Sequence, residues 1–156
     1  MKILGIDPGL QKTGWGIISY QDNRLRYVAS GLIKTNAKHD MADRLAILHF
    51  GLLEVIEAHQ PETAAIEETF QNKNPKSTLK LGHARGVLMC VPAQRGLNVA
   101  EYGANKVKKS VVGSGHAAKE QMGMMIRTLL PACGDISEDE ADALAVAITH
   151  AHHHVL

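Results

Sequence analysis

Acidic residues stand at three places where the chain leaves an apolar segment or starts a helix. Asp7 ends the apolar run of residues 3–6, Glu67 ends a largely apolar run of residues 63–66, and Asp139 and Asp142 open an Ala/Leu-rich segment. Carboxylate oxygens from strand ends and a helix start suit Mg²⁺, which keeps several waters and usually shares its remaining positions with substrate phosphates. The acids therefore predict a magnesium site that acts on a phosphate-containing substrate.

Two of these acids also have ordinary structural explanations. Asp7 precedes Pro8 and Gly9, and aspartate before a turn is a common choice without any function. Glu67 and Glu68 point to opposite faces of their strand, so only one of them can share the side of Asp7. The period of two leaves open which glutamate that is.

The acids of the last segment can be divided by their place in a helix. Ser137 and Glu140 form a capping box, which puts Glu138 and Asp139 in the first turn, where carboxylates stabilise the positive end of the helix dipole. Asp142 lies beyond the cap in an apolar stretch, three residues from Asp139 and on the same face. Capping does not explain Asp142, so we expect it to be functional.

Charge is segregated along the chain, although the net charge is only +1. From residue 69 to residue 119 there are nine bases and one acid, Glu101, while the remainder carries eight bases and fifteen acids. A solvated basic face without a partner is the usual explanation of such a run. Fifty residues with one acid are unusual enough that we expect a phosphate-binding surface.

Length and composition indicate one ordinary folded domain. The chain has 156 residues, 45% hydrophobic and 21% charged, and no apolar run approaches the roughly 20 residues of a membrane helix. The start lacks the pattern of a secretory signal. Cys90 and Cys133 have no CxxC partner, so we expect buried free thiols and a reducing cytoplasm.

The apolar periodicity predicts an α/β fold with a five-stranded mixed sheet flanked by helices. Strands are expected at residues 3–7, 14–20, 25–35, 63–67 and 97–102, the first three antiparallel, and helices at 41–59, 76–95, 117–130 and 137–152. Proline at position 92 is expected to end or bend the second helix early. Residues 153–156 are expected to form a frayed tail.

Several blocks, in order, closely resemble the RuvC family of bacterial Holliday-junction resolvases. The first is weakly specific, because actin-like ATPases and sugar kinases share it, but those need two such domains. Together the blocks are highly specific, and the resemblance runs from about Met1 to His152. They are Gly-Ile-Asp-Pro-Gly at residues 5–9, Ala-Ile-Glu-Glu-Thr-Phe at 65–70, Lys-Leu-Gly-His-Ala-Arg-Gly at 80–86, Lys-Lys-Ser-Val-Val-Gly at 108–113 with Lys119, and Asp-Glu-Ala-Asp-Ala-Leu-Ala at 139–145.

The resemblance implies a single ribonuclease H-like domain that acts as a homodimer, with residues 76–95 as the dimer helix and 87–91 as its apolar contact. It implies two Mg²⁺, with Mn²⁺ as the alternative ion, and selects Glu67 over Glu68. It further implies hydrolysis that leaves 5′-phosphate and 3′-hydroxyl ends, and RuvA and RuvB as partner proteins. The implied metal-site and catalytic residues are Asp7, Glu67, Asp139 and Asp142.

The family also uses basic and aromatic positions at the DNA. Phe70, isolated in a polar loop, is expected to stack on a base at an opened junction rather than to pack in the core. Lys108 and Lys119 match family positions beside the scissile phosphate, although each could be an ordinary surface lysine. The remaining expected phosphate contacts are Lys73, Lys76, Lys80 and Arg85.

Two other functions remain open at this point. One is a ribonuclease H-like enzyme of other specificity, acting on RNA–DNA hybrids or flaps. The other is a protein that binds junctions without cutting, although a pure binder gains nothing from burying acids beside a phosphate backbone. His150, His152, His153 and His154 are interpreted as incidental composition at a fraying chain end.

Overall fold

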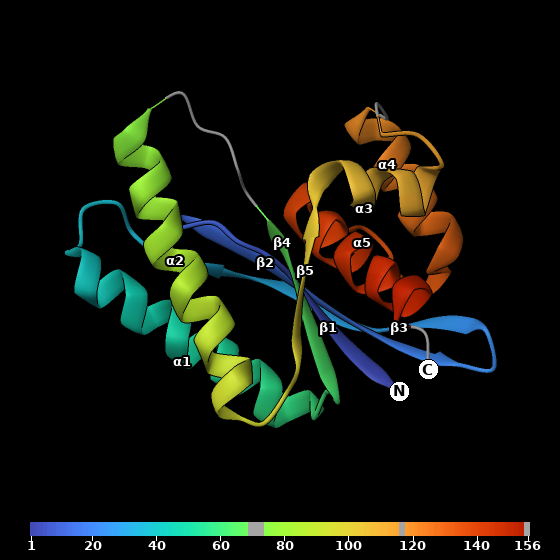
Figure 1. Ribbon diagram of the computed structural model, residues 1–156, viewed down its shortest axis with the longest axis horizontal. Helices are drawn as coiled ribbons and strands as arrows, with labels where there is room; N and C mark the ends of the chain where they lie inside the picture. The colour runs from blue at the N-terminus through green and yellow to red at the C-terminus, as the bar shows by residue number, and fades with distance from the viewer. Residues whose placement is uncertain (69–73, 116–117, 155–156) are drawn as a thin grey trace.

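A single mixed sheet forms the middle layer of the computed structural model, which describes residues 1–68, 74–115 and 118–154 (Figure 1). The sheet has five strands in the order β3-β2-β1-β4-β5. β1, β2 and β3 pair antiparallel as successive hairpins, while β4 and β5 run parallel to β1. The strands are β1 (Lys2–Asp7), β2 (Lys12–Gln21), β3 (Arg24–Lys34), β4 (Thr63–Glu68) and β5 (Val99–Gly103).

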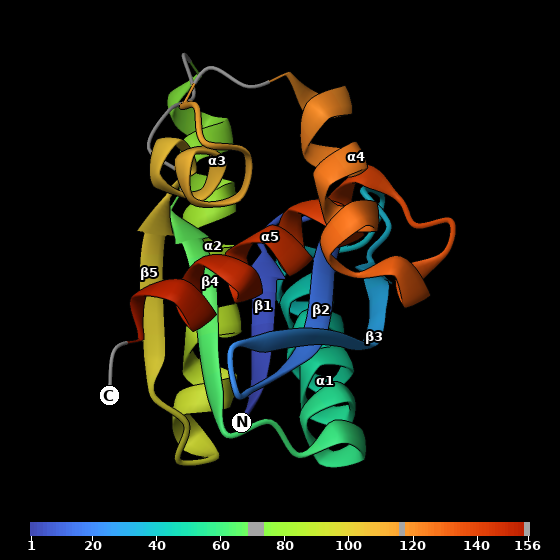
Figure 2. The ribbon, with the colours of Figure 1, turned by 90° about the vertical axis from the view of Figure 1, so that its right-hand side faces the viewer.

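Helices cover both faces of the sheet. α1 (Met41–His59) and α2 (Pro75–Gln94) pack side by side on one face, and α5 (Glu138–His153) crosses the other (Figure 1, Figure 2). α3 (Ala104–Val112) and α4 (Lys119–Leu129) pack against α5, and a 3-10 turn (Pro131–Cys133) packs against α4 and β3. The predicted five-stranded α/β architecture is thereby confirmed.

Successive side chains of β1 point to opposite faces of the sheet and pack in two separate hydrophobic cores. Ile3 packs with Ala65 and Leu144 in the core under α5, whereas Leu4 and Ile6 pack in the core under α1 and α2. Because residues i and i+2 of a strand share a face, these two cores fix the face of every other residue in β1. Asp7 therefore lies on the α5 face.

Most predicted elements lie where periodicity put them. The first helix matches at residues 41–59, and α2 begins at Pro75, where Asn74 caps it by accepting a hydrogen bond from the Lys76 amide at 3.0 Å. Sequence analysis missed α3, a nine-residue helix with only two buried side chains, Val107 and Val111. Val107 and Val111 have the four-residue spacing of one helical face, but two such positions in nine residues are too few to identify a helix.

The structure contradicts the expected early end of α2 and the expected burial of one cysteine. The helix does not end early at Pro92, which occupies its last turn, and it continues to Gln94. Leu88 and Val91 of the expected dimer contact are buried in the protein's own core. Cys133 is buried as expected, but Cys90 is exposed, and both are free thiols. No helix in the described ranges combines the length and apolarity needed to cross a bilayer.

Candidate metal centre

The sheet register places Asp7 beside Glu67. β1 and β4 are parallel, and Ile6 of β1 is paired with Ile66 of β4, so the next residues of the two strands lie side by side at their carboxyl ends. Ala65 packs in the α5 core, and Glu67, two residues on, takes the same face. Glu68 takes the opposite face. Strand register thus supplies the choice that the sequence pattern left open.

The other two acids come from the first turns of α5, whose start is strongly specified. Ser137 and Glu140 form the predicted capping box, with the Ser137 amide donating to Glu140 at 2.8 Å and the Glu140 amide donating to Ser137 at 3.2 Å. Ser30 of β3 also donates to Glu140 at 2.9 Å. These bonds fix the helix start against the sheet, and with it Asp139 and Asp142.

Glycines let α5 lie close enough to the sheet to join the acids, a feature that sequence analysis missed. A Cβ on Gly5 would come within 2.0 Å of the Ala143 carbonyl oxygen, and one on Gly14 within 2.1 Å of the Asp139 carbonyl oxygen. Gly14 is the strand partner of Asp7. The available signal was the alternation of glycines at residues 14 and 16, which puts both on one face of β2.

Carboxylate oxygens of Asp7, Asp139 and Asp142 lie within 4.8 Å of one another. The carboxyl groups of Asp7 and Glu67 lie close enough to interact by hydrogen bonding, so the fourth predicted acid contacts the same group. The structure therefore brings all four predicted acids to one end of the sheet, on the α5 face.

Burial and mutual repulsion strongly perturb these acids. Burial, followed by the charges of Glu67 and Asp142, raises the pKa of Asp7 from 3.8 to about 9. Burial also raises the pKa of Glu67 and of Asp142, and the nearby positive charges of Lys108 and Lys119 oppose both shifts. Asp7, Glu67 and Asp142 thus resist ionisation unless a cation is present.

The donor set fits a hard divalent cation. Its atoms are carboxylate oxygens, which Mg²⁺ prefers, and they converge within the reach of one ion or a closely spaced pair. Binding of a cation would relieve the repulsion between Asp7 and its acidic neighbours, which contributes to the raised pKa of Asp7. The described residues can therefore hold a metal ion.

Lys108 and Lys119 line an adjoining pocket of about 190 Å³, together with Glu67 and Asp142. Lys108 is half-buried on α3. Lys119 starts α4 and meets Glu138 at 3.3 Å, and that contact is the main reason its pKa is raised. Both members of this ion pair are largely exposed, so the pair contributes little stability, and Lys119 can turn to another anion.

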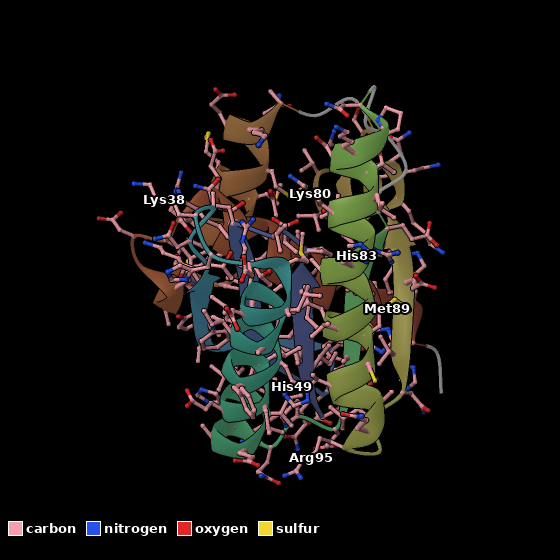
Figure 3. The ribbon with its side chains drawn as sticks, turned by 90° about the vertical axis from the view of Figure 1, so that its left-hand side faces the viewer. Lys38, His49, Lys80, His83, Met89 and Arg95 are labelled. Carbon is pink, nitrogen blue, oxygen red and sulfur yellow. The ribbon has the colours of Figure 1, made fainter. Side chains whose placement is uncertain are left out.

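The remaining predicted DNA contacts lie on or near α2. Phe70 and Lys73 fall outside the described residues. Lys76 and Lys80 are exposed in the first turns of the helix, and Figure 3 shows the position of Lys80. Arg85 forms an ion pair with Glu101 of β5 at 2.7 Å. Its charge is already compensated, which the charge run could not reveal.

The interpretation of the C-terminal histidines as a fraying end is wrong for most of them. α5 continues through His153, and His150 is 4% exposed. Its Nε2 meets the Thr63 hydroxyl at 3.0 Å and its Nδ1 meets the Tyr102 hydroxyl at 2.8 Å. His150 therefore fastens the end of α5 to β4 and β5. His154 follows the helix, and residues 155–156 are outside the described part.

A family model described as "Crossover junction endodeoxyribonuclease RuvC" matches residues 3–150. The chain belongs to the RuvC family. A RuvC from Paramagnetospirillum magneticum is 61% identical over 98% of this chain and 92% of its own, and one from Azorhizobium caulinodans is 60% identical over 98% and 90%. The resemblance to RuvC that the motifs indicated is thereby confirmed.

Solved RuvC structures share the fold. Thermus thermophilus RuvC superimposes with a TM-score of 0.88 at 32% identity, covering 99% of this chain and 95% of that one. T. thermophilus RuvC in complex with a Holliday junction substrate gives 0.89 at 33% identity, covering 97% and 93%. The yeast mitochondrial resolvase Ydc2, at 13% identity and a TM-score of 0.70, shows the fold alone. The ribonuclease H-like fold is confirmed.

Proposed function

We infer that this chain is a structure-selective endonuclease that resolves four-way DNA junctions by paired symmetric nicks, in recombination and repair. One observation carries the inference. The acids that converge at the ends of β1, β4 and α5 belong to a chain that matches, over 97% of its length, a RuvC bound to a Holliday junction. Phosphodiester hydrolysis is the reaction that a carboxylate cluster with adjoining lysines can perform.

Asp7, Glu67, Asp139 and Asp142 are proposed to hold two Mg²⁺ and to be the catalytic residues. Asp7 is the ligand for both ions, because it lies in contact range of acids on β4 and on α5. When bound, the ions supply a water of lowered pKa and offset charge on the departing 3′ oxygen. Mn²⁺, with the same preference for oxygen ligands, is the alternative ion.

The lysines complete the chemistry from outside the metal set. Lys108 and Lys119 border the acids, so each can offset charge that develops on the scissile phosphate. The protein forms no covalent bond to DNA, and hydrolysis leaves a 5′-phosphate and a 3′-hydroxyl that a ligase can join. Residues 1–156 act as one ribonuclease H-like nuclease domain in this proposal.

DNA contacts beyond the reacting phosphate are proposed along the start of α2. Lys76 and Lys80 are exposed there and contact phosphates, and Lys73 and Phe70 precede them in the chain, Phe70 stacking on an unpaired base. Arg85 joins them only by exchanging its Glu101 partner for a phosphate.

A homodimer is proposed because two opposed cuts in a nearly two-fold substrate need two matching sites. α2 offers the surface, but not through the core residues Leu88 and Val91. Leu79 is 63% exposed on α2 and Phe50 is 62% exposed on the neighbouring α1. These apolar side chains are the proposed contact.

RuvA and RuvB are the proposed protein partners, by membership of the family, and the bacterial cytoplasm is the proposed compartment, because the substrate is chromosomal DNA. No residue of this chain is assigned to a contact with either protein.

The test is a cleavage panel. Purified protein is incubated with a synthetic four-way junction of varied core sequence, a matched duplex and an RNA–DNA hybrid, each with and without Mg²⁺. Paired, ligatable nicks in the junction alone, dependent on Mg²⁺, are expected. Preferred cutting of the RNA–DNA hybrid would contradict the proposed specificity for four-way junctions. Tight binding of the junction without any cut would contradict the proposed nuclease activity.

A further inference from the structure

Two lysines face each other across β2 and β3, at the same edge of the sheet as the acids. Lys12 is paired directly with Lys34. Both side chains are exposed, and neither makes an ion pair within residues 1–68, 74–115 and 118–154. Like charges directly opposite each other destabilise an antiparallel pair. The free protein thus keeps an uncompensated pair of positive charges, which an anion would neutralise.

The pair also lies on the face that carries the acids. Gly14 faces α5, because a Cβ there would strike the Asp139 carbonyl oxygen. Lys12 is two residues before Gly14 and shares that face, and Lys34 shares it through the cross-strand pairing. Gly14 is itself the partner of Asp7. The lysines therefore lie just beyond Asp7, on the α5 side of the sheet edge.

The order of strands places these residues in an oblique row across the end of the sheet. The neighbouring strands β3, β2, β1 and β4 (Figure 2) carry Lys34, Lys12, Asp7 and Glu67 in turn. Neighbouring strands are about 4.8 Å apart and Lys12 is two residues beyond Gly14, the partner of Asp7, so the backbone positions of Lys12 and Lys34 are roughly 8 and 12 Å from that of Asp7. Lys108 lies near the Glu67 end of the row. Positive charge thus stands on both sides of the acids.

The strand ends that carry the lysines are firmly held. The Thr35 amide donates to the Gln11 carbonyl oxygen at 3.0 Å, and the Thr35 hydroxyl donates to the Leu10 carbonyl oxygen at 2.5 Å. Arg44, only 8% exposed, donates from Nε to the same hydroxyl at 2.9 Å and has no acidic partner in the described part of the chain. The site is therefore rigid, and a third positive charge lies behind it.

We propose that Lys12 and Lys34 bind phosphates of the cut DNA strand on the side of the scissile phosphate opposite to Lys108. This inference rests on the proposed function and adds a contact that the charge pattern concealed, since both lysines lie in the acid-rich part of the sequence. A strand crossing the sheet edge would meet the lysine pair, the acids and Lys108 in succession.

The test compares two double variants that remove the same charge from the same hairpin. K12Q/K34Q removes the two lysines at the end of the sheet that carries the acids. R24Q/R26Q removes two exposed arginines at the opposite end of β3 and is the matched control. Affinity for a four-way junction is measured without divalent metal over a range of salt concentrations. Each junction is also made with single uncharged methylphosphonates at successive positions on both sides of the scissile phosphate.

For K12Q/K34Q we expect about a tenfold loss of junction affinity at 0.1 M salt, and a slope of log K against log salt reduced by about 1 to 2. Methylphosphonates on one side only should weaken binding of the wild type but not of this variant. Its melting temperature should equal or exceed that of the wild type, because a repulsive pair is removed. R24Q/R26Q should change affinity less than threefold.

Equal effects of the two double variants, or the same methylphosphonate profile for K12Q/K34Q and the wild type, would overturn the inference while the wild type still binds and cuts junctions. A wild type that neither binds nor cuts them would overturn the proposed function as well.

Discussion

The two ends of α5 bury polar groups against the same strands with opposite results. At the C-terminal end, His150 meets Thr63 of β4 and Tyr102 of β5, so each group has a neutral hydrogen-bond partner. At the N-terminal end, Asp139 and Asp142 meet Asp7, another acid. A satisfied network stabilises a fold, whereas a cluster of like charges costs stability unless a cation neutralises it. We therefore interpret the C-terminal end of α5 as structural and propose the N-terminal end as functional.

The largest effect is expected for Asp7→Asn. Cutting of a four-way junction should fall by about 10³-fold or more, because the ligand proposed to serve both ions loses its charge. The metal-free protein should become more stable by roughly 2 kcal/mol, since the group whose pKa is raised to about 9 no longer resists ionisation at pH 7. Single-turnover cleavage assays check the loss of cutting, and urea unfolding in EDTA checks the gain in stability. A variant that still cuts would contradict the account.

Gly14→Ala should come next. Its Cβ would meet the Asp139 carbonyl oxygen at 2.1 Å and so displace the start of α5 from Asp7. We expect at least a hundredfold loss of cutting with about 2 kcal/mol lost from the free energy of unfolding. Gly82→Ala on α2, where nothing lies within 4 Å, should instead gain up to about 1 kcal/mol. Full activity in Gly14→Ala would show that the helix start can move freely.

His150→Ala tests the C-terminal end of α5, where the buried polar groups are hydrogen-bonded. It leaves the Thr63 and Tyr102 hydroxyls without their buried partner, so unfolding should become easier by about 2–3 kcal/mol. The loss should be the same with and without Mg²⁺, unlike the effect of Asp7→Asn. Denaturant titrations at both metal conditions check this. A metal-dependent loss would show that the two ends of α5 are not separate.

The smallest expected effects are in the pH dependence of stability, where the two ends have opposite signs. The pKa of Asp7 is raised from 3.8 to about 9 in the folded protein, so its contribution is full below about pH 3.8 and is lost as pH rises toward 9. Burial lowers the pKa of His150 from 6.5 to about 4, so its contribution is full above pH 6.5 and is lost as pH falls toward 4.

Melting curves in EDTA across pH 4–9 should therefore slope downward on the alkaline side for the wild type. In Asp7→Asn the alkaline side should flatten, and below about pH 6.5 stability should fall more steeply as pH falls, because the His150 contribution is no longer offset by that of Asp7. If the melting temperature of this variant still fell with rising pH as it does in the wild type, a group other than Asp7 would be the cause of that fall.

The features that depend on neighbours within one segment of the chain were predicted from the sequence. The capping box at Ser137 and the positions of Asp139 and Asp142 follow from spacing within one helix. The choice between Glu67 and Glu68 did not, because it depends on the register of β4 against β1, which no single strand encodes. Family resemblance selected Glu67, and the register places it on the Asp7 face.

Other features were hidden because they depend on tertiary neighbours. His150 looked like a residue of a fraying end, since its partners lie 87 and 48 residues away in the chain. Arg85 looked free within a basic run, although Glu101 on β5 pairs with it. Periodicity and charge counts describe one segment at a time, and these contacts join segments.

The most direct test compares two adjacent glutamates that differ only in the face they occupy. Single-turnover rates of paired nicking in a four-way junction with Mg²⁺ are measured for Glu67→Gln and Glu68→Gln, which remove the same charge from neighbouring positions of β4. The account predicts that Glu67→Gln loses cutting by about 10³-fold and that Glu68→Gln stays within about threefold of the wild type. Equal rates for the two variants, or a greater loss for Glu68→Gln, would contradict it.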